Sequence, residues 1–152
     1  MDGKIYCIGT ITADLYHANT SVNLSSVGNI NNKEPSNDSL PIGHLNYYLG
    51  GTATNVAVGL SHFQVPVHLI AKVGPDQLGE NLLKIIEKYP ISYDTEPSVK
   101  PTSMVVVNTN IHSQTVTFDS YSQGTAYSDL QPSDLPTLTT SEDIIVLSST
   151  IY

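Results

Sequence analysis

Apolar residues near the start of the chain form a continuous run and do not alternate with polar ones. Residues 4–9 are mostly apolar and end in a glycine. A strand that is covered on both faces has this pattern, so the run predicts a strand of a parallel sheet. Residues 67–73 and 144–149 repeat the pattern and predict two further strands, each buried on both faces.

Just before and just after the second of these runs, the apolar spacing becomes that of a helix. From about 52 to 63, apolar residues recur every three or four positions, which predicts an amphipathic helix. A second such set spans residues 78–89, with Asp76 as a candidate N-cap and Pro90 as the terminator. Strand, helix, strand and helix in this order predict a right-handed α/β layer.

The next part of the chain has β-strand character. Residues 103–108 and 115–120 are rich in β-branched residues and are joined by a polar spacer, which predicts a hairpin with one wet face. Residues 19–39 are rich in Asn and Ser and predict a loop or a polar β excursion. The run at 144–149 has no helix after it to cover the sheet, which favours a partial domain.

Composition and charge exclude several classes of protein. Six basic residues against fourteen acidic ones give a net charge of −8 and an acidic pI, which argues against a nucleic-acid surface. The single cysteine, Cys7, cannot form an internal disulfide. No apolar run approaches the roughly 20 residues that span a bilayer, and no signal peptide is apparent. We therefore expect a cytoplasmic globular protein that binds neither nucleic acid nor membrane.

The most informative chemistry lies at the start of the first predicted helix. Gly50 and Gly51 allow a ligand to approach the backbone closely, and a helix N-terminus offers free N–H donors. The amide of Asn55, within or just past the first turn, can both donate and accept hydrogen bonds, which suits a polyhydroxylated ligand. Alternatively, the two glycines only permit a tight turn and Asn55 caps the helix locally. The spacing alone leaves both interpretations open.

These residues also carry a resemblance to a known family. Gly50-Gly51-x-x-x-Asn55-x-Ala57, followed by Val-Gly-Pro-Asp-Gln-Leu-Gly at 73–79, resembles the first signature of the PfkB/ribokinase family of carbohydrate and nucleoside kinases. Ile-Gly-Thr-Ile-Thr-Ala-Asp at 8–14 resembles the opening strand of that family, and residues 101–103 resemble the entry to its β-lid. The similarity covers the chain in the family's order, but it matches only the N-terminal half of a family member.

The resemblance implies a fold and a set of site residues. The fold would be α/β and ribokinase-like: a Rossmann-like parallel sheet flanked by helices, with a small β-lid, truncated before the ATP-binding half. Residues 1–152 would be the N-terminal part of that domain, with approximate lid segments at 15–49 and 101–127. In the family, the aspartate of the opening strand and the Gly-Gly…Asn element hold sugar hydroxyls.

Carried over residue by residue, this implies a substrate site at Asp14, Gly50, Gly51 and Asn55. For Asp14 the alternative is a cap of the turn after the first strand. Thr52 stands where several sugar kinases have a lysine or another polar residue, which leaves the choice of ligand open.

The C-terminal signature of the family is missing from the sequence. That element, Asp-Thr-x-Gly-Ala-Gly-Asp, supplies the general base and an anion hole, and nothing in the chain matches it. We therefore assign no catalytic and no metal-binding residue. The resemblance implies ATP and Mg²⁺ for the complete enzyme, and we expect neither to bind this chain alone.

Two functions are consistent with these observations. The chain is either the substrate-binding half of an ATP-dependent sugar or nucleoside kinase, inactive on its own, or a non-catalytic sugar- or nucleoside-binding or oligomerisation module. In either case we expect a small-molecule ligand, and either a homodimer through the lid or a partner that supplies the C-terminal half.

Overall fold

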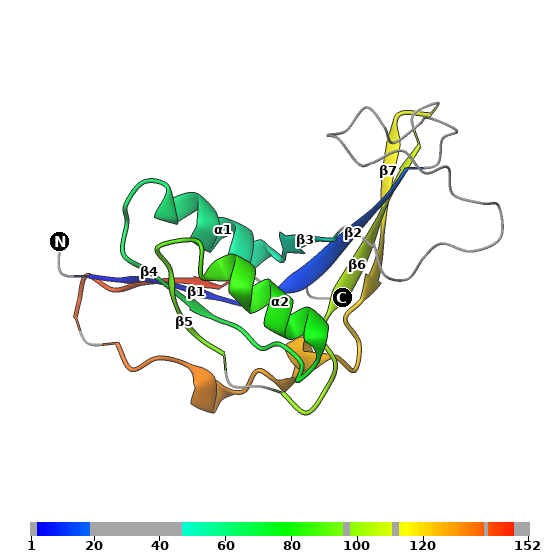
Figure 1. Cartoon of the computed structure of the whole chain (residues 1–152). Helices are drawn as coiled ribbons and strands as arrows, with labels where there is room; N and C mark the ends of the chain where they lie inside the picture. The colour runs from blue at the N-terminus through cyan, green and yellow to red at the C-terminus, as the bar shows by residue number, and fades with distance from the viewer. Residues whose placement is uncertain (1–2, 19–46, 96–97, 111–112, 139, 148–152) are drawn as a thin grey trace.

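The described residues form two four-stranded sheets and two α-helices (Figure 1). A computed structural model describes residues 3–18, 47–95, 98–110, 113–138 and 140–147 of the 152-residue chain. The second sheet projects from one end of the first (Figure 1). The predicted α/β fold class with a parallel sheet is therefore confirmed.

The first sheet is parallel throughout, as the continuous apolar runs predicted. Its strands, in spatial order, are β5 (Ser92–Asp94), β4 (Val67–Ile70), β1 (Ile5–Ile8) and β8 (Ile144–Leu147). The two central strands, β1 and β4, supply fully buried side chains to the core, such as those of Cys7 and Leu69. The short edge strand β5 was not predicted, because three residues are too few to show an apolar period.

Both helices cover the same face of this sheet (Figure 1). The first, α1 (Thr52–Ser61), ends before the predicted boundary near residue 63. Gln64 lies just beyond it at φ 58°, a left-handed conformation that a continuing helix does not have, and the Phe63 side chain is 80% exposed. The second, α2 (Gln77–Ile86), packs Leu82 and Ile86 into the core.

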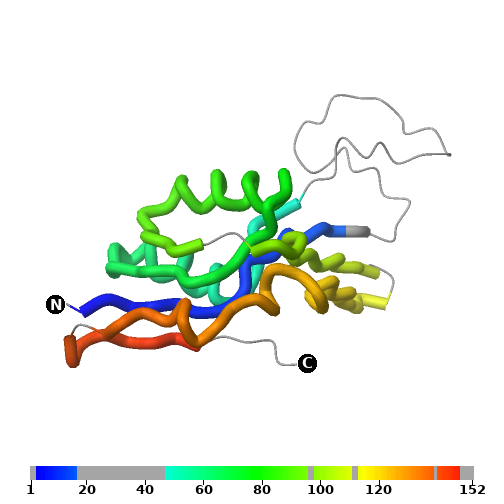
Figure 2. The backbone as a smooth tube through the Cα atoms, turned by 90° about the horizontal axis from the view of Figure 1, so that it is seen from below, coloured from blue at the N-terminus to red at the C-terminus, as the bar shows by residue number. Residues whose placement is uncertain are grey.

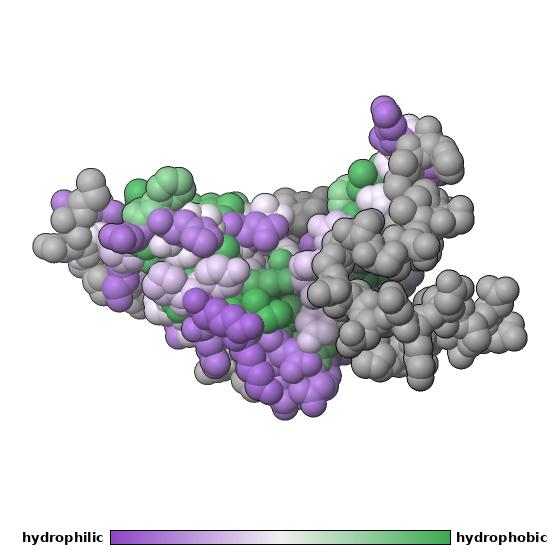
Figure 3. Space-filling view, turned by 45° about the horizontal axis from the view of Figure 1, so that its top comes forward, coloured by the Kyte–Doolittle hydropathy of each residue, from purple (hydrophilic) through white to green (hydrophobic). Residues whose placement is uncertain are grey.

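The other face of the sheet is crossed by the segment that leads from β7 towards β8 (Figure 2). Leu130 of this segment packs against Tyr6, Ile8 and Ile70. Seen obliquely from the helix side, the surface mixes hydrophilic and hydrophobic residues, with a hydrophobic area near its middle (Figure 3). No helix in the described part of the chain is long and apolar enough to cross a membrane.

The second sheet contains the predicted hairpin and two strands that were not predicted. Its strands, in spatial order, are β3 (Tyr47–Gly50), β2 (Thr12–Ala18), β6 (Met104–Asn110) and β7 (Thr115–Tyr121). β2 pairs antiparallel with β3 and parallel with β6, and β6 and β7 form the hairpin. The Asn- and Ser-rich stretch at 19–39 lies outside the described residues, and the assignment of 15–49 and 101–127 to a lid stays a prediction.

The prediction that the strand after residue 143 is buried on both faces is wrong. Ile144, Ile145 and Leu147 are 53%, 47% and 72% exposed. Among the described residues, β8 is an edge strand whose one neighbour in the sheet is β1. The apolar side chains of β8 therefore form an exposed surface that other residues can cover.

A carboxylate joins α2 to the base of the second sheet. Asp76 caps α2, as predicted, by accepting a hydrogen bond from the Gly79 backbone N–H at 2.8 Å. It also accepts bonds from the backbone N–H and the hydroxyl of Thr102, at 2.8 and 2.7 Å, just before β6 begins. Burial by itself would raise the pKa of the Asp76 carboxyl, but the bonds from Thr102 and Gly79 outweigh it and hold that pKa below its ordinary value.

We expect Asp76→Ala to lower the free energy of unfolding by about 1–3 kcal/mol at pH 7, because the variant loses an N-cap and leaves donors of Thr102 unpaired. Because the pKa of Asp76 is lowered in the folded state, its stabilising effect is complete at a pH above the unfolded-state pKa of about 3.9. The effect is lost as the pH falls through the folded-state pKa. Urea unfolding at pH 7 and pH 3 should therefore show a difference between wild type and variant that shrinks in acid. Glu80→Ala, an exposed change in the same helix turn, is the control; an equal effect of both variants would contradict the account.

Candidate functional site

A small pocket lies where β2, the start of α1 and the β6–β7 hairpin meet. It has a volume of about 210 Å³. Asp14, Gly51 and Asn55, three of the four predicted site residues, line it. The fourth, Gly50, lies directly beside Asp14, since a Cβ atom on Gly50 would be 2.2 Å from the Asp14 carboxyl. The structure therefore brings all four predicted residues to one place, although they are up to 41 positions apart in the sequence.

Asp14 lies in the middle of β2, with its side chain half-buried. The alternative role as a cap of the turn after the first strand is therefore wrong. The hydroxyl of Thr12, two residues earlier on the same face of the strand, donates a hydrogen bond of 2.7 Å to the carboxylate. Burial raises the pKa of the Asp14 carboxyl, and the bond from Thr12 partly opposes that rise.

Gly51 is the N-cap of α1 and adopts a φ of 99°, which a residue with a side chain rarely tolerates. A Cβ atom there would be 2.2 Å from the backbone oxygen of Thr10. The buried Thr54 hydroxyl donates to the same oxygen at 2.8 Å, which ties the first turn of the helix to the end of β1. Gly51 is thus required by contacts inside the chain, and a side chain at Gly50 would displace the Asp14 carboxyl, whether or not a ligand also approaches either glycine.

Asn55 is in the first turn of α1, where its backbone N–H donates to the Gly51 oxygen at 2.8 Å and closes the first helical bond. Its side chain is exposed at the pocket, and no described residue hydrogen-bonds its amide group. The local-cap alternative for Asn55 is therefore not what the structure shows. The amide is available to donate to and accept from a molecule in the pocket.

Several lining residues were not predicted from the sequence. They are the polar Thr10, Thr12, Thr52, Ser120 and Ser122 and the apolar Val105, Phe118 and Tyr127. Side chains alternate between the two faces of a strand, so Thr12 shares a face with Asp14 on β2, and Phe118 shares a face with Ser120 on β7. Which face meets the helix depends on strand register, in which Asp14 pairs with Val105 and Val105 pairs with Ser120. The sequence carried no signal for that register.

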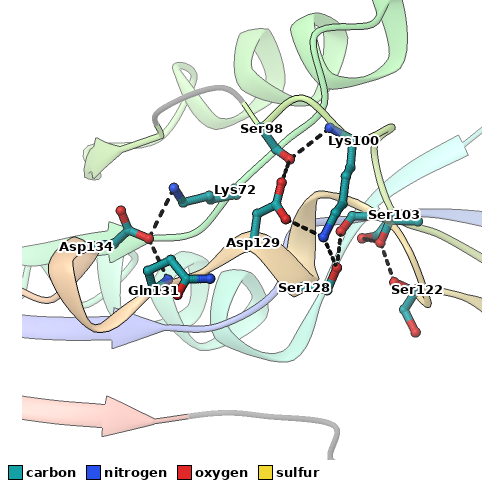
Figure 4. Close-up of polar contacts among 10 residues, drawn as sticks. Lys72, Ser98, Lys100, Ser103, Ser122, Ser128, Asp129, Gln131 and Asp134 are labelled. Carbon is teal, nitrogen blue, oxygen red and sulfur yellow. Dashed lines mark hydrogen bonds and ion pairs between the residues drawn. The ribbon is translucent and has the colours of Figure 1, made fainter.

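A second polar cluster fastens the segment after β7 to the core (Figure 4). Asp129 contacts the Lys100 ammonium and the Ser98 hydroxyl, and these two bonds hold the pKa of its carboxyl below the ordinary value. Lys72 Nζ lies 3.1 Å from a carboxylate oxygen of Asp134, which also accepts a bond of 2.7 Å from the backbone N–H of Gln131. All of these groups are satisfied by one another, as expected of a structural cluster.

Lys72 and Asp134 also line a larger, open cavity of about 820 Å³, which contains none of the predicted site residues. The described residues do not fit a nucleotide triphosphate in either cavity. The smaller pocket has no basic residue in its lining, and the larger one has only Lys72, whose charge is already paired. Within the described residues, no three His, Cys, Asp or Glu side chains converge as a metal site would require.

The family model described as pfkB family carbohydrate kinase matches residues 2–151. The chain belongs to that family. The resemblance that the Gly50-Gly51…Asn55 element suggested is therefore confirmed, and the ribokinase-like fold with it. Among curated proteins, nothing matches this pfkB-family chain.

Solved structures of sugar kinases have the same fold. An uncharacterised sugar kinase from Pyrococcus horikoshii is 26% identical, with a TM-score of 0.62 over 87% of this chain and 40% of its own. A fructokinase from Xylella fastidiosa with bound ATP is 17% identical, with a TM-score of 0.66 over 90% of this chain and 38% of its own. A PfkB protein from Polaromonas sp. JS666 is 18% identical, with a TM-score of 0.65 over 88% and 40%. The pfkB-family chain thus spans about 40% of the length of these structures.

Two glycine variants test the geometry of the helix start. Gly51→Ala should lower the free energy of unfolding by about 1–3 kcal/mol, because its φ of 99° and the Thr10 oxygen both oppose a side chain. Gly59→Ala is the matched control, since no atom lies within 4 Å of a Cβ at that helical position, and it should stabilise the protein by about 0.5–1 kcal/mol. Thermal or urea unfolding of both variants measures the difference. Equal effects of the same sign would show that the helix start is not constrained in this way.

Proposed function

We propose that this chain forms the acceptor-binding part of an ATP-dependent sugar or nucleoside kinase. The observation that carries the proposal is the meeting, in one pocket of a pfkB-family chain, of the half-buried Asp14 carboxylate with the unengaged Asn55 amide. A polyhydroxylated acceptor needs both strong acceptors and groups that donate, and these two side chains supply them.

Each group has a distinct part in holding the acceptor. One oxygen of Asp14 already accepts a bond from Thr12, so the carboxylate is oriented in advance and keeps lone pairs for ligand hydroxyls. Asn55 can donate to one hydroxyl oxygen and accept from another. The start of α1 at Gly51 and Thr52 adds backbone N–H groups that no helical carbonyl engages.

ATP and Mg²⁺ would supply the phosphoryl group and stabilise its charge in the complete family enzyme. The described residues do not fit either group, so we assign no step of phosphoryl transfer to this chain. Its residues bind and orient the acceptor hydroxyl, and the transfer itself belongs to the part of the family domain that this chain does not span.

We further propose that the chain acts in the cytoplasm, either as a homodimer through the lid or with a partner that supplies the C-terminal half. The exposed Ile144, Ile145 and Leu147 of edge strand β8 support a partner there, because such a strand offers both unpaired backbone groups and apolar area. The single, buried cysteine is consistent with a reducing compartment.

The purified 152-residue chain should not phosphorylate ribose, fructose or adenosine with ATP and Mg²⁺. The reason is that nothing in its sequence matches the family signature that supplies the base and the anion hole for the transferred group. A coupled ADP-release assay measures this directly. Sustained turnover proportional to protein concentration, and lost in Asp14→Ala, would contradict the assignment of catalysis to the missing part.

Asn55→Ala and Asp14→Asn should each weaken acceptor binding by about 1–3 kcal/mol, because each leaves buried ligand hydroxyls without a partner. Asn81→Ala on α2, outside the pocket, is the matched control. Titration calorimetry with sugars and nucleosides measures the affinities. Unchanged affinity in both site variants, or an equal loss in the control, would remove these residues from the site.

Acceptor binding should also depend on pH through Asp14. Its side chain accepts hydrogen bonds from ligand hydroxyls more strongly when it is ionised than when it is protonated, and burial raises its pKa. Affinity should therefore be constant near neutral pH and should decrease as the pH is lowered. Because the pKa is raised, this decrease should begin at a higher pH than for an ordinary aspartate, whose pKa is about 4. Asp14→Asn should bind more weakly but with a flat profile over the same range. A wild-type profile as flat as that of the variant would argue against contact with the carboxylate.

A further inference from the structure

The apolar residues of the pocket lining are confined to one side of it. The carboxylate and amide groups come from β2 and the start of α1. Val105 of β6, Phe118 of β7 and Tyr127 of the 3₁₀ helix η3 (Ala126–Asp129) line the opposite side, together with the hydroxyls of Ser120 and Ser122. A ligand that fills the pocket must therefore satisfy hydrogen-bonding groups around it and also present an apolar surface to the Phe118 ring.

Strand register extends the apolar side beyond the pocket. Phe118 pairs with Val107 across the hairpin, and Val107 pairs with Tyr16 of β2. Tyr48 of β3 pairs with Asp14 and meets the Tyr16 ring edge to face, with ring centroids 5.3 Å apart. Phe118, Tyr16 and Tyr48, which we call the aromatic strip, lie on the same face of the second sheet as Asp14. Tyr16 is two residues further along β2, Tyr48 is the β3 partner of Asp14, and Phe118 lies on β7, beyond β6.

The strip is exposed in the chain as described. Phe118 is 64% exposed, and Tyr16 and Tyr48 are also exposed. A phenyl ring in water next to hydrogen-bonding groups gains free energy when a flat apolar surface covers it, and a nucleobase has such a surface. A free sugar can bind Asp14 and Asn55 through its hydroxyls but offers the Phe118 ring less apolar surface than a nucleoside does.

The charge of the pocket residues also limits which ligands can bind. The pocket contains Asp14 and no Lys in its lining, and the chain as a whole carries a net charge of −8. A phosphorylated ligand would bring negative charge against a carboxylate with no cation to compensate it. The pocket therefore favours an uncharged ligand.

We infer that the acceptor is an unphosphorylated nucleoside, whose ribose hydroxyls bind Asp14 and Asn55 while its base packs on Phe118. This rests on the proposed function and narrows its substrate from sugars in general to one class. Phe118 is then the residue that determines the preference for a nucleoside over the free sugar.

Titration calorimetry on the 152-residue chain tests the inference with adenosine, guanosine, uridine, cytidine, D-ribose, D-fructose and adenosine 5′-monophosphate. At least one nucleoside should bind about tenfold more tightly than ribose, since stacking of one base on an aromatic ring is of that order. The monophosphate should bind more weakly than adenosine. Phe118→Ala should weaken nucleoside binding about tenfold and leave ribose binding within about twofold of wild type.

Two further variants separate the role of the ring from general effects. Phe118→Tyr keeps the ring and should retain the preference for nucleosides. Val116→Ala, an exposed apolar change on the same strand outside the pocket, should alter neither ligand class. If Phe118→Ala has a lower melting temperature than wild type, the ratio of nucleoside to ribose affinity in Phe118→Tyr and Val116→Ala still decides the question.

The failures are distinguishable. Equal affinity for ribose and every nucleoside, or an equal loss of both in Phe118→Ala, overturns the inference and leaves the proposed function standing. If no sugar or nucleoside binds at millimolar concentration, the proposed function fails and the inference with it. A dimer that Phe118→Ala dissociates, combined with equal ribose and nucleoside affinities, would assign the aromatic strip to contact between copies of the chain and overturn the inference.

Discussion

The site depends on the close approach between the start of α1 and the beginning of β2. Gly51 leaves no room for a side chain against the Thr10 oxygen, and Gly50 leaves none against the Asp14 carboxyl. This contact places Asn55, one helical turn after Gly51, beside a carboxylate that precedes it by 41 residues in the sequence. A methyl group at Gly51 would clash with the Thr10 backbone, and one at Gly50 would displace the Asp14 carboxyl from its present position.

A second constraint fixes the opposite side of the pocket. The hairpin that carries Phe118 and Ser120 begins next to Thr102, which Asp76 holds through two hydrogen bonds. The buried contact of 2.6 Å between the hydroxyls of Ser103 and Thr125 joins the two ends of the hairpin. The pocket thus lies between a helix start and a hairpin whose base is tied to the N-cap of the next helix, so that its lining is positioned by hydrogen bonds at both ends.

Much of this arrangement could be predicted from the sequence. Continuous apolar runs predict β1 and β4 because strands of a parallel sheet are covered on both faces, and a 3.6-residue period predicts both helices. The Asp76 cap could be predicted from its place before an apolar helical period. The four site residues were predicted only through the resemblance to a family, since their spacing alone left a tight turn as an equal alternative.

Other features could not be predicted, for physical reasons. β2 contains Asp14, Tyr16 and His17 among small or apolar residues, so it has no clean period, and it is a strand because β3 and β6 pair with it on either side. The apolar side of the pocket depends on register between strands that lie about 90 residues apart in sequence. The apolar sequence of β8 predicted burial, but burial depends on what lies beside a strand, and only β1 does.

A crystal structure of the chain with a bound sugar or nucleoside would show whether Asp14 and Asn55 bind the acceptor together. We expect acceptor hydroxyls within hydrogen-bonding distance of both the Asp14 carboxylate and the Asn55 amide, in the pocket beside Gly51. An acceptor found instead in the larger cavity beside Lys72 and Asp134, or in contact with neither Asp14 nor Asn55, would contradict this expectation.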